Sequence, residues 1–189
     1  MSLFFSKSSP LKLLFTWIAC LWILHPIPSH AETIDKKKLL KIEAAYLYKF
    51  TKFIKWPDRL FNQSSNLNIC LVGSNLDALN RLLTKGVSGK QSNGRTLRIY
   101  YYQTDHPSTN EHNCHLIYLD QHASNSLTTN LDFPSTLLIS APNHKHKKDS
   151  LIYLEILNGK LVFFINQNHL DTSELEINAA LLSLARKRL

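Results

Sequence analysis

The sequence predicts an α/β fold: a largely parallel mixed sheet sandwiched by helices, with a C-terminal antiparallel hairpin and a closing helix. Three observations predict it. An amphipathic helix comes first, short apolar runs then alternate with helical segments, and two runs joined by Asn158-Gly159 stand near the end. Alternating strands and helices are typical of a parallel sheet, whereas a two-residue Asn-Gly turn joins antiparallel strands.

Residues 1–31 have the features of a secretory signal peptide. Two lysines come first, residues 13–24 (LLFTWIACLWIL) are apolar and uncharged, and Ser29-His30-Ala31 offers small residues for cleavage. The apolar stretch is shorter than the roughly 20 residues of a membrane span. An uncleaved anchor is the alternative. We expect cleavage near Ala31 and export, with residues 32–189 forming a single domain.

The basic charge of the chain is concentrated in one segment. The formal net charge is +8, and it falls to +6 without residues 1–31, which carry two lysines and no acid. Seven of the remaining basic residues lie between Lys36 and Lys55. In an exported protein, such a segment suggests an anionic membrane face or an acidic protein partner, and makes nucleic acid a weaker interpretation.

Two cysteines remain after cleavage, Cys70 and Cys114. In an oxidising compartment, one disulfide is the simplest interpretation of an even count. Such a bridge would stabilise the fold by at most about 4 kcal/mol in the chain-entropy model. Free buried thiols are one alternative. A catalytic pair of Cys114 with His115 is another, although nothing else nearby indicates it; otherwise His115 packs or points to water at a strand end.

The first element of the domain is an amphipathic helix expected at Ile34–Trp56. Its apolar residues recur every three or four positions, and its lysines fall on the opposite face. Pro57 is expected to end it, because the residue before a proline is disfavoured in the α region. Glu43 falls within the apolar stripe, so we expect it to reach the rim of the stripe or to pair with a basic side chain of another element.

The rest of the domain alternates strands and helices. We expect Ser74 and Asp77 to form a capping pair at a helix start, and Asn93-Gly94 to form a tight turn. Strands are expected at Asn66–Val72, Leu97–Tyr102, His115–Leu119, Thr136–Ser140, Ser150–Leu157 and Lys160–Ile165, and helices at Leu76–Thr84, Gln121–Leu131 and Leu175–Arg188.

Few residues indicate chemistry. Gly73 and Ser74 lie between a strand and a helix, where a helix N-terminus can hold an anion, although a plain capped turn is the default interpretation. Phosphate-loop, nucleotide-binding, hydrolase, zinc-protease and CxxC signatures are absent. His144 and His146 alternate with lysines that repel a cation, so we interpret this segment as a solvated basic loop. We therefore expect no enzyme, no cofactor and no metal site.

Several stretches together are similar to one known family. They are AAYLYKFTKFIKWP (44–57), NICLVG (68–73), NGRTLRI (93–99), CHLIYL (114–119), NGKLVFFIN (158–166) and EINAALLSLAR (176–186). In this order they resemble the YfiR-like family of exported bacterial regulators. The resemblance covers nearly all of residues 32–189, and it depends on the combination of motifs.

The resemblance implies a periplasmic α/β domain, often a homodimer, without catalytic machinery. The characterised type binds the periplasmic region of an inner-membrane diguanylate cyclase and represses it. An outer-membrane lipoprotein or redox stress releases it, so that cyclic-di-GMP rises. Cysteines that match Cys70 and Cys114 lie in the same motifs of that type. Its second bridge, near the final hairpin, has no counterpart here, which puts a redox switch on that pair in doubt.

Other relatives accompany other membrane sensors. A sensor or small-ligand-binding subunit of a receptor such as a histidine kinase is therefore the alternative function. For a protein contact, we expect a patch at the end of the first helix that contains Lys49, Lys52, Lys55 and Trp56, because aromatic anchors dominate interfaces. The alternative for Trp56 is that it only covers the core.

Overall fold

The computed structural model describes residues 35–103, 113–123, 134–145 and 147–186. The expected signal peptide lies outside these residues, as does most of the helix expected at Gln121–Leu131. The α-helices are α2 (Lys36–Phe53), α3 (Asp77–Gly86), α5 (Gln167–Thr172) and α6 (Ala179–Leu184), and the 3₁₀ helices are η1 (Asp58–Phe61) and η3 (Lys147–Asp149). The strands are β1 (Ile54–Lys55), β2 (Asn66–Val72), β3 (Gln91–Ser92), β4 (Arg95–Tyr102), β5 (Leu116–Leu119), β6 (Leu137–Ser140), β7 (Ile152–Leu157), β8 (Lys160–Ile165) and β9 (Glu176–Ile177).

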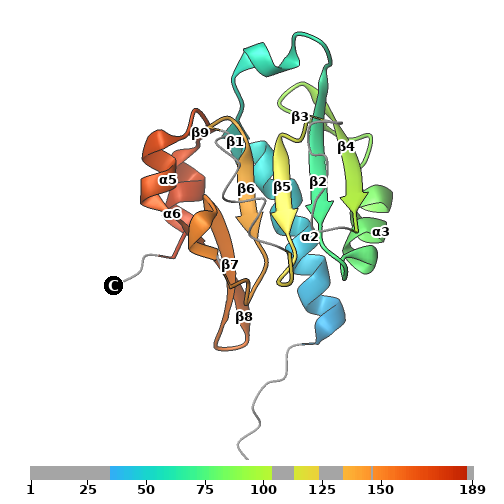
Figure 1. Ribbon diagram of the computed structural model, residues 1–189, viewed down its shortest axis with the longest axis vertical. Coiled ribbons are helices and arrows are strands. Elements are labelled where there is room, and N and C mark those ends of the chain that lie inside the picture. Colours follow the sequence, from blue (N-terminus) through green and yellow to red (C-terminus); the bar gives the residue numbers. More distant parts are fainter. Residues whose placement is uncertain (1–34, 104–112, 124–133, 146, 187–189) are drawn as a thin grey trace, which may run out of the picture. The chain divides into compact units, whose positions relative to one another are not determined.

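A seven-stranded mixed sheet organises the domain, in the order β3-β4-β2-β5-β6-β7-β8 (Figure 1). The strands β4, β2, β5, β6 and β7 run parallel to one another, and the two outermost pairs, β3 with β4 and β7 with β8, are antiparallel. The predicted fold class is therefore confirmed, including the C-terminal hairpin and a helix after it.

Apolar side chains cover both faces of the sheet. The larger cluster joins Leu47 and Phe50 of α2 and Leu79 and Leu83 of α3 to one face of β2, β4 and β5. A smaller cluster on the opposite face contains both cysteines together with Ile117 and neighbouring residues of β2 and β5. All four side chains of β5 are buried, as expected for a central strand of a parallel sheet.

Both Asn-Gly pairs form the turns that the sequence predicts. Asn93 and Gly94 have φ angles of 50° and 75°, and Asn158 and Gly159 have φ angles of 48° and 71°. Two consecutive positive φ angles define a type I′ turn, whose twist matches that of a hairpin. These turns set the register of β3 with β4 and of β7 with β8.

The first helix ends three residues earlier than the sequence predicts. It stops at Phe53, and the next two residues form β1, which pairs antiparallel with β9 through Ile54↔Ile177 and Lys55↔Glu176. The tertiary pairing therefore ends the helix before Pro57 is reached.

The C-terminal helix expected at Leu175–Arg188 is wrong in its extent. The chain first forms β9 against β1, and Asn178 then caps the short helix α6 by accepting a hydrogen bond from the N–H of Ala180 at 2.8 Å. The sequence analysis also missed α5, which Asn166 caps in the same way.

Candidate functional site

A disulfide joins β2 to the residue two positions before β5. Cys70 and Cys114 are bonded, with their Cα atoms 5.8 Å apart, and both side chains are buried. The predicted bridge is confirmed, and the alternative of two free thiols is wrong for this structure. Because Cys114 carries no free thiol, it offers no nucleophile for a Cys–His pair.

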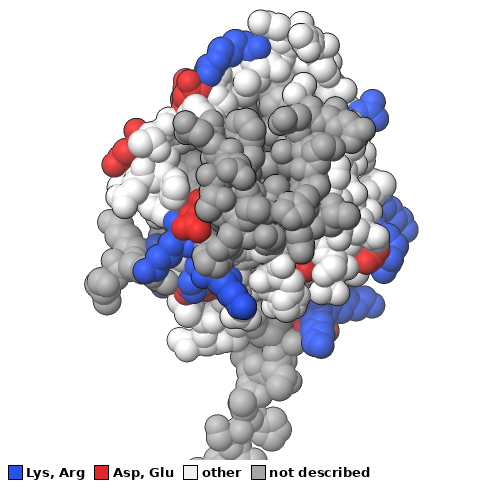
Figure 2. Space-filling view, viewed as in Figure 1, with Lys and Arg blue, Asp and Glu red and all other residues white. Residues whose placement is uncertain are grey.

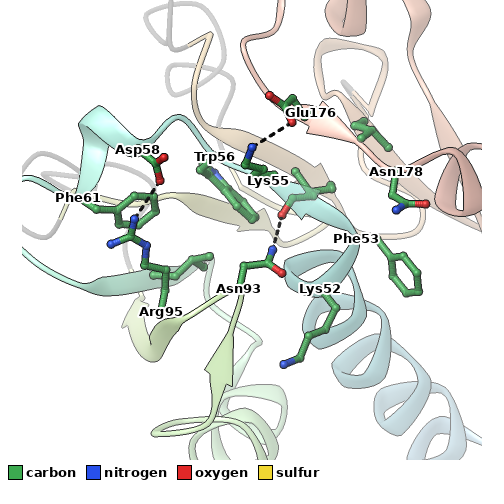
Figure 3. A pocket seen from close by; sticks show the side chains of 13 residues that line it. Lys52, Phe53, Lys55, Trp56, Asp58, Phe61, Asn93, Arg95, Glu176 and Asn178 are labelled. Carbon is green, nitrogen blue, oxygen red and sulfur yellow. Dashed lines mark hydrogen bonds and ion pairs between the residues drawn. The ribbon is translucent and has the colours of Figure 1, made fainter.

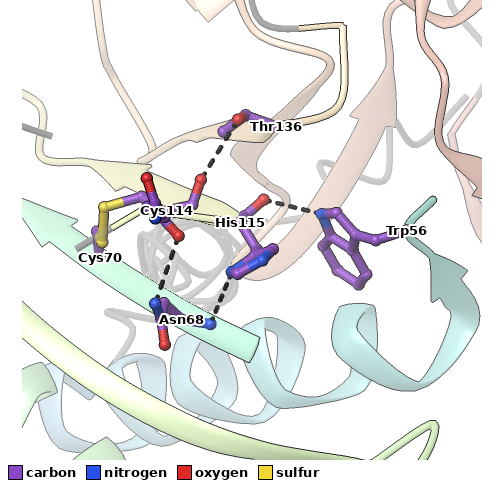
Figure 4. Close-up of a disulfide and its surroundings, with 7 residues drawn as sticks. Trp56, Asn68, Cys70, Cys114, His115 and Thr136 are labelled. Atoms are coloured by element: carbon purple, nitrogen blue, oxygen red, sulfur yellow. Dashed lines mark hydrogen bonds between the residues drawn. A yellow bond between two sulfur atoms is a disulfide. The ribbon is translucent and has the colours of Figure 1, made fainter. Parts of the chain in front are cut away.

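His115 packs in the core and forms hydrogen bonds there (Figure 4). Its ring stacks on Phe61 with the ring centres 4.7 Å apart, and its Nδ1 accepts a hydrogen bond from the N–H of Asn68 at 3.1 Å. Its backbone carbonyl accepts a hydrogen bond from Nε1 of Trp56 at 3.0 Å. Burial, and then the charge of Arg95, lower the pKa of His115 to about 4. At neutral pH the ring is therefore uncharged and has a structural role.

The Trp56 and Phe61 side chains contribute to a pocket at the end of α2 (Figure 3). The pocket has a volume of about 430 Å³. Its wall comes from five segments: the α2–β1 junction, the neighbouring η1, one residue of β2, the β3–β4 hairpin, and β9 with the residue after it. The lining residues are Lys52, Phe53, Ile54, Lys55, Trp56, Asp58, Phe61, Leu67, Asn93, Arg95, Glu176, Ile177 and Asn178.

Hydrogen bonds to backbone carbonyl groups hold these segments together. The side-chain amide of Asn93 donates hydrogen bonds to the carbonyls of Thr51 and Ile54 at 3.2 and 3.1 Å. The N–H of Asn178 donates to the carbonyl of Phe53 at 2.9 Å. Asn93 thus has two roles, since its backbone makes the turn and its side chain binds carbonyl groups at the end of α2.

Charged and apolar side chains line the pocket together. The Arg95 guanidinium lies 4.1 Å from the centre of the Phe61 ring and 3.0 Å from a carboxylate oxygen of Asp58. Lys55 and Glu176 lie 3.4 Å apart, and both side chains are largely exposed. Such an exposed pair contributes roughly 0–1 kcal/mol, so a partner can separate it at little cost. The arrangement suits a group with an apolar body and a carboxylate.

Comparison with known families identifies the chain. The family model described as YfiR/HmsC-like matches residues 40–186. The chain belongs to the YfiR/HmsC-like family. This family is one of periplasmic regulators in cyclic-di-GMP signalling, and its members act without catalysis. No curated protein matches the chain in a direct comparison.

In this YfiR/HmsC-like chain, the four residues expected at a partner contact are divided between surface and core. Lys49, Lys52 and Lys55 are exposed, and the last two line the pocket. Trp56 is only 3% exposed and packs in the core, as in the alternative interpretation of this residue. The sequence analysis did not predict that Arg95 and Glu176 line this pocket, and no local sequence pattern marks either residue.

Gly73 and Ser74 lie at the end of β2, where the Asp120 carboxylate comes close to them. A Cβ atom on Gly73 would lie 2.2 Å from Cβ of Asp120, and an Asp120 carboxylate oxygen accepts the N–H of Asn75 at 3.3 Å. The expected capping pair is wrong, because residue 76 occupies the cap position and its side chain makes no capping hydrogen bond to α3. The Asp120 carboxylate already accepts the Asn75 N–H, which a bound anion would need as a donor. Its negative charge would also repel an anion.

No basic side chain among the described residues pairs with Glu43, contrary to the second of our two expectations. Its carboxylate binds the Tyr118 hydroxyl inside the domain, with the Asp120 carboxylate close enough to act on its charge. Burial, and to a lesser degree Asp120, raise the pKa of Glu43 to about 7, although the hydrogen bond from Tyr118 opposes this. The same surroundings raise the pKa of Tyr118 well above its usual value.

The histidine-rich loop differs from the predicted solvated loop. His144 is 2% exposed, because the turn after β6 directs it inward, with its N–H donating to the carbonyl of Ala141 at 3.3 Å. His146 lies outside the described residues. Within the described ranges, no three His, Cys, Asp or Glu side chains are grouped so that they could hold a metal ion. The helices of the same ranges include none with the length and apolar character needed to cross a membrane.

Proposed function

We propose that this chain is a periplasmic regulatory binding protein that represses an inner-membrane signalling protein, most directly a diguanylate cyclase. Membership of the YfiR/HmsC-like family is the observation that carries this proposal. To repress a partner, the chain must bind its inactive conformation more tightly than its active one. Release of the chain then raises cyclic-di-GMP.

We infer that the partner contacts the exposed lysines at the end of α2 and the adjoining pocket. Lys49, Lys52 and Lys55 give this surface its positive charge, and the Lys55–Glu176 pair separates at little cost. An acidic side chain of the partner can take the place of Glu176, while an apolar side chain enters the space beside Phe61 and Arg95. Both features favour a partner loop that combines acidic and aromatic residues.

Deletion of the gene tests the proposed function directly. We expect cellular cyclic-di-GMP to rise on deletion and to return to its original level when the gene is restored. Unchanged cyclic-di-GMP on deletion contradicts the proposal.

Charge reversal tests the contact. Restoring the gene as Lys55→Glu should fail to lower cyclic-di-GMP, because a second carboxylate then faces Glu176 and repels an acidic partner. Lys41→Glu is the matched control, since Lys41 is exposed on α2, which leads into β1, and does not line the pocket. Equal repression by the two variants, both present at normal abundance, contradicts the assignment of this surface.

The pocket favours a second function, that of a small-ligand-binding sensor subunit for another receptor such as a histidine kinase. Its volume of about 430 Å³ is within the usual range of roughly 300–1,000 Å³ for ligand pockets. A thermal-shift screen with nucleotides and small anions tests this function, and no shift at millimolar ligand argues against it. A neighbouring gene that encodes a membrane protein with a cyclase or a kinase output distinguishes the two functions.

We further propose that residues 1–31 are removed on export and that the mature chain forms a homodimer. N-terminal sequencing of protein from the cell envelope should begin at Glu32, and sedimentation should give twice the mass of one mature chain. A chain that retains residues 1–31 contradicts the first proposal, and a monomer at micromolar concentration contradicts the second.

A further inference from the structure

The two edges of the main sheet differ in whether their outward backbone N–H and C=O groups form hydrogen bonds. At one edge, β8 is covered: the Leu161 carbonyl accepts the Tyr46 hydroxyl at 3.1 Å, and the Phe163 carbonyl accepts the N–H of Arg186 at 3.0 Å. Covering an edge in this way prevents it from pairing with another strand.

Described residues cover only part of the opposite edge. The strand β3 pairs with the first two residues of β4, and Leu97 of β4 then exchanges hydrogen bonds with Gly89 and Lys90 at 2.9 and 2.8 Å. Beyond Leu97, no described segment pairs with the outer side of β4, although β4 continues to Tyr102.

Alternation along the strand identifies the backbone groups that face outward. Tyr102 accepts the N–H of Gly73 on the side of β2, whereas Leu97 bonds to the outer side. Because successive residues point their backbone groups to opposite sides, Ile99 and Tyr101 direct their N–H and C=O groups outward. Among the described residues, these four groups have no strand opposite them.

The side chains of this stretch lack the usual protection of an edge. Positions 99–102 are Ile-Tyr-Tyr-Tyr, with no proline and no charge, and all four side chains are partly buried. Ile99 and Tyr101 lie on the face covered by α3, and Tyr100 and Tyr102 lie on the face of the disulfide. β-Branched and aromatic side chains of this kind stabilise pairs with a neighbouring strand.

The charge around the edge indicates the kind of strand that fits it. Residues 77–102, which form α3, β3 and β4, contain five basic residues and one acidic residue. Four of the basic side chains, Arg81, Lys85, Lys90 and Arg98, are exposed. In Figure 2, Lys and Arg side chains lie along the side of the domain that holds α3 and β4. An acidic strand is attracted to this edge, whereas a second copy of the chain brings the same positive charges.

We propose that the outer edge of β4 at Ile99–Tyr101 binds an extended, acidic segment of a partner protein by strand addition. The four outward backbone groups would supply the hydrogen bonds, and the flanking tyrosines would supply side-chain contacts. This binding mode is separate from the pocket at the end of α2 and does not depend on the proposed repression of a cyclase.

Amide exchange measured by NMR on the full mature chain tests the proposal. We expect the amides of Ile99 and Tyr101 to exchange rapidly in the free protein, in contrast to those of Arg98 and Tyr100, which face β2. Titration with the peptide acetyl-(Glu-Val)₃-Glu-amide should slow exchange at both positions, and added salt should weaken the effect. The corresponding Lys-Val peptide should not bind.

A proline at position 99 provides a sharp variant, because the only backbone hydrogen-bonding group it removes is the outward N–H at this position. Ile99→Pro should weaken binding of the acidic peptide about tenfold for the loss of one hydrogen bond. Ile99→Ala is the matched control, since it loses the side chain but keeps the N–H. If Ile99→Pro does not fold, Arg98→Glu serves instead and should lower the affinity of the acidic peptide, because it replaces a positive charge beside the edge by a negative one.

Three results would overturn the proposal. Slow exchange of Ile99 and Tyr101 in the free chain at every protein concentration would mean that the edge is already covered. Slow exchange that appears with rising concentration, together with a doubled mass, would mean that a second copy occupies it. Equal binding of the acidic and basic peptides would remove the charge preference.

Discussion

Glu43 provides the sharpest test of the structure, since a carboxylic acid lies where a charge is poorly solvated. Burial and the nearby Asp120 carboxylate raise its pKa from 4.5 to about 7. Below pH 4.5 the acid is protonated in both the folded and the unfolded chain. As the pH rises from 4.5 to 7, the unfolded chain loses its proton first, so the folded state loses relative stability.

The size of the effect follows from the pKa shift. Each pKa unit corresponds to about 1.4 kcal/mol, so ionisation of Glu43 lowers the free energy of unfolding by about 3 kcal/mol above pH 7. Glu43→Gln removes the ionisation and keeps an oxygen to accept the Tyr118 hydroxyl. The variant should therefore be more stable than the parent at pH 8, by up to about 3 kcal/mol, and the difference should shrink towards pH 4.5.

Urea unfolding of parent and variant at pH 4.5 and pH 8 measures this difference, because the other titrating groups cancel between the two proteins. Glu176→Gln is the control, since it removes an exposed carboxylate and should change stability by less than about 1 kcal/mol. An equal stability difference between parent and Glu43→Gln at both pH values would refute the reasoning.

Three further predictions concern the core. Trp56→Phe leaves the buried carbonyl of His115 without the indole N–H, and thermal unfolding should show a loss of about 1–3 kcal/mol; an unchanged melting temperature would contradict this. Gly73→Ala places a Cβ atom against Asp120, so denaturant unfolding should show a larger loss than Gly89→Ala, where no atom lies within 4 Å; equal losses would argue against the contact. Replacing both cysteines by alanine should cost at most about 4 kcal/mol for a sequence separation of 44, and identical melting curves would count against the bridge.

Local patterns predicted most of the sheet. The strand at Asn66–Val72 and the strand at Lys160–Ile165 have the predicted bounds, and both Asn-Gly turns form as expected. These elements are predictable because a short apolar run and a residue pair that accepts positive φ act over a few neighbouring residues. The disulfide was predictable for a different reason, since only two cysteines follow the expected signal peptide.

The ends of α2 and α6 were not predictable in this way. The residues from Ile54 to Trp56 continue the helical pattern of α2, yet the first two of them pair with β9. The amphipathic pattern after Leu175 likewise favours a helix, but Glu176 and Ile177 form a strand there. In both places a contact with a distant segment outweighs the weak local preference for a helix.

The candidate site was found only in part from the sequence. Lys52 and Lys55 stood out because they lie on the charged face of a predicted helix. Arg95 and Glu176 did not stand out, because each belongs to the site through a contact with another segment. Arg95 contacts Phe61, and Glu176 contacts Lys55. The sequence also could not predict whether Trp56 is exposed or buried, since a tryptophan at a helix end suits both an interface and a core.

The sequence by itself determined the alternation of elements, the two hairpin turns and the single bridge, because these depend on neighbouring residues or on a count. The tertiary structure alone decided which side chains surround the pocket, that Glu43 meets Tyr118 and Asp120, and which strand edge is not covered by any described segment. These features depend on the order of strands in the sheet and on desolvation. Both arise only when residues that are far apart in the chain are brought together and water is removed between them.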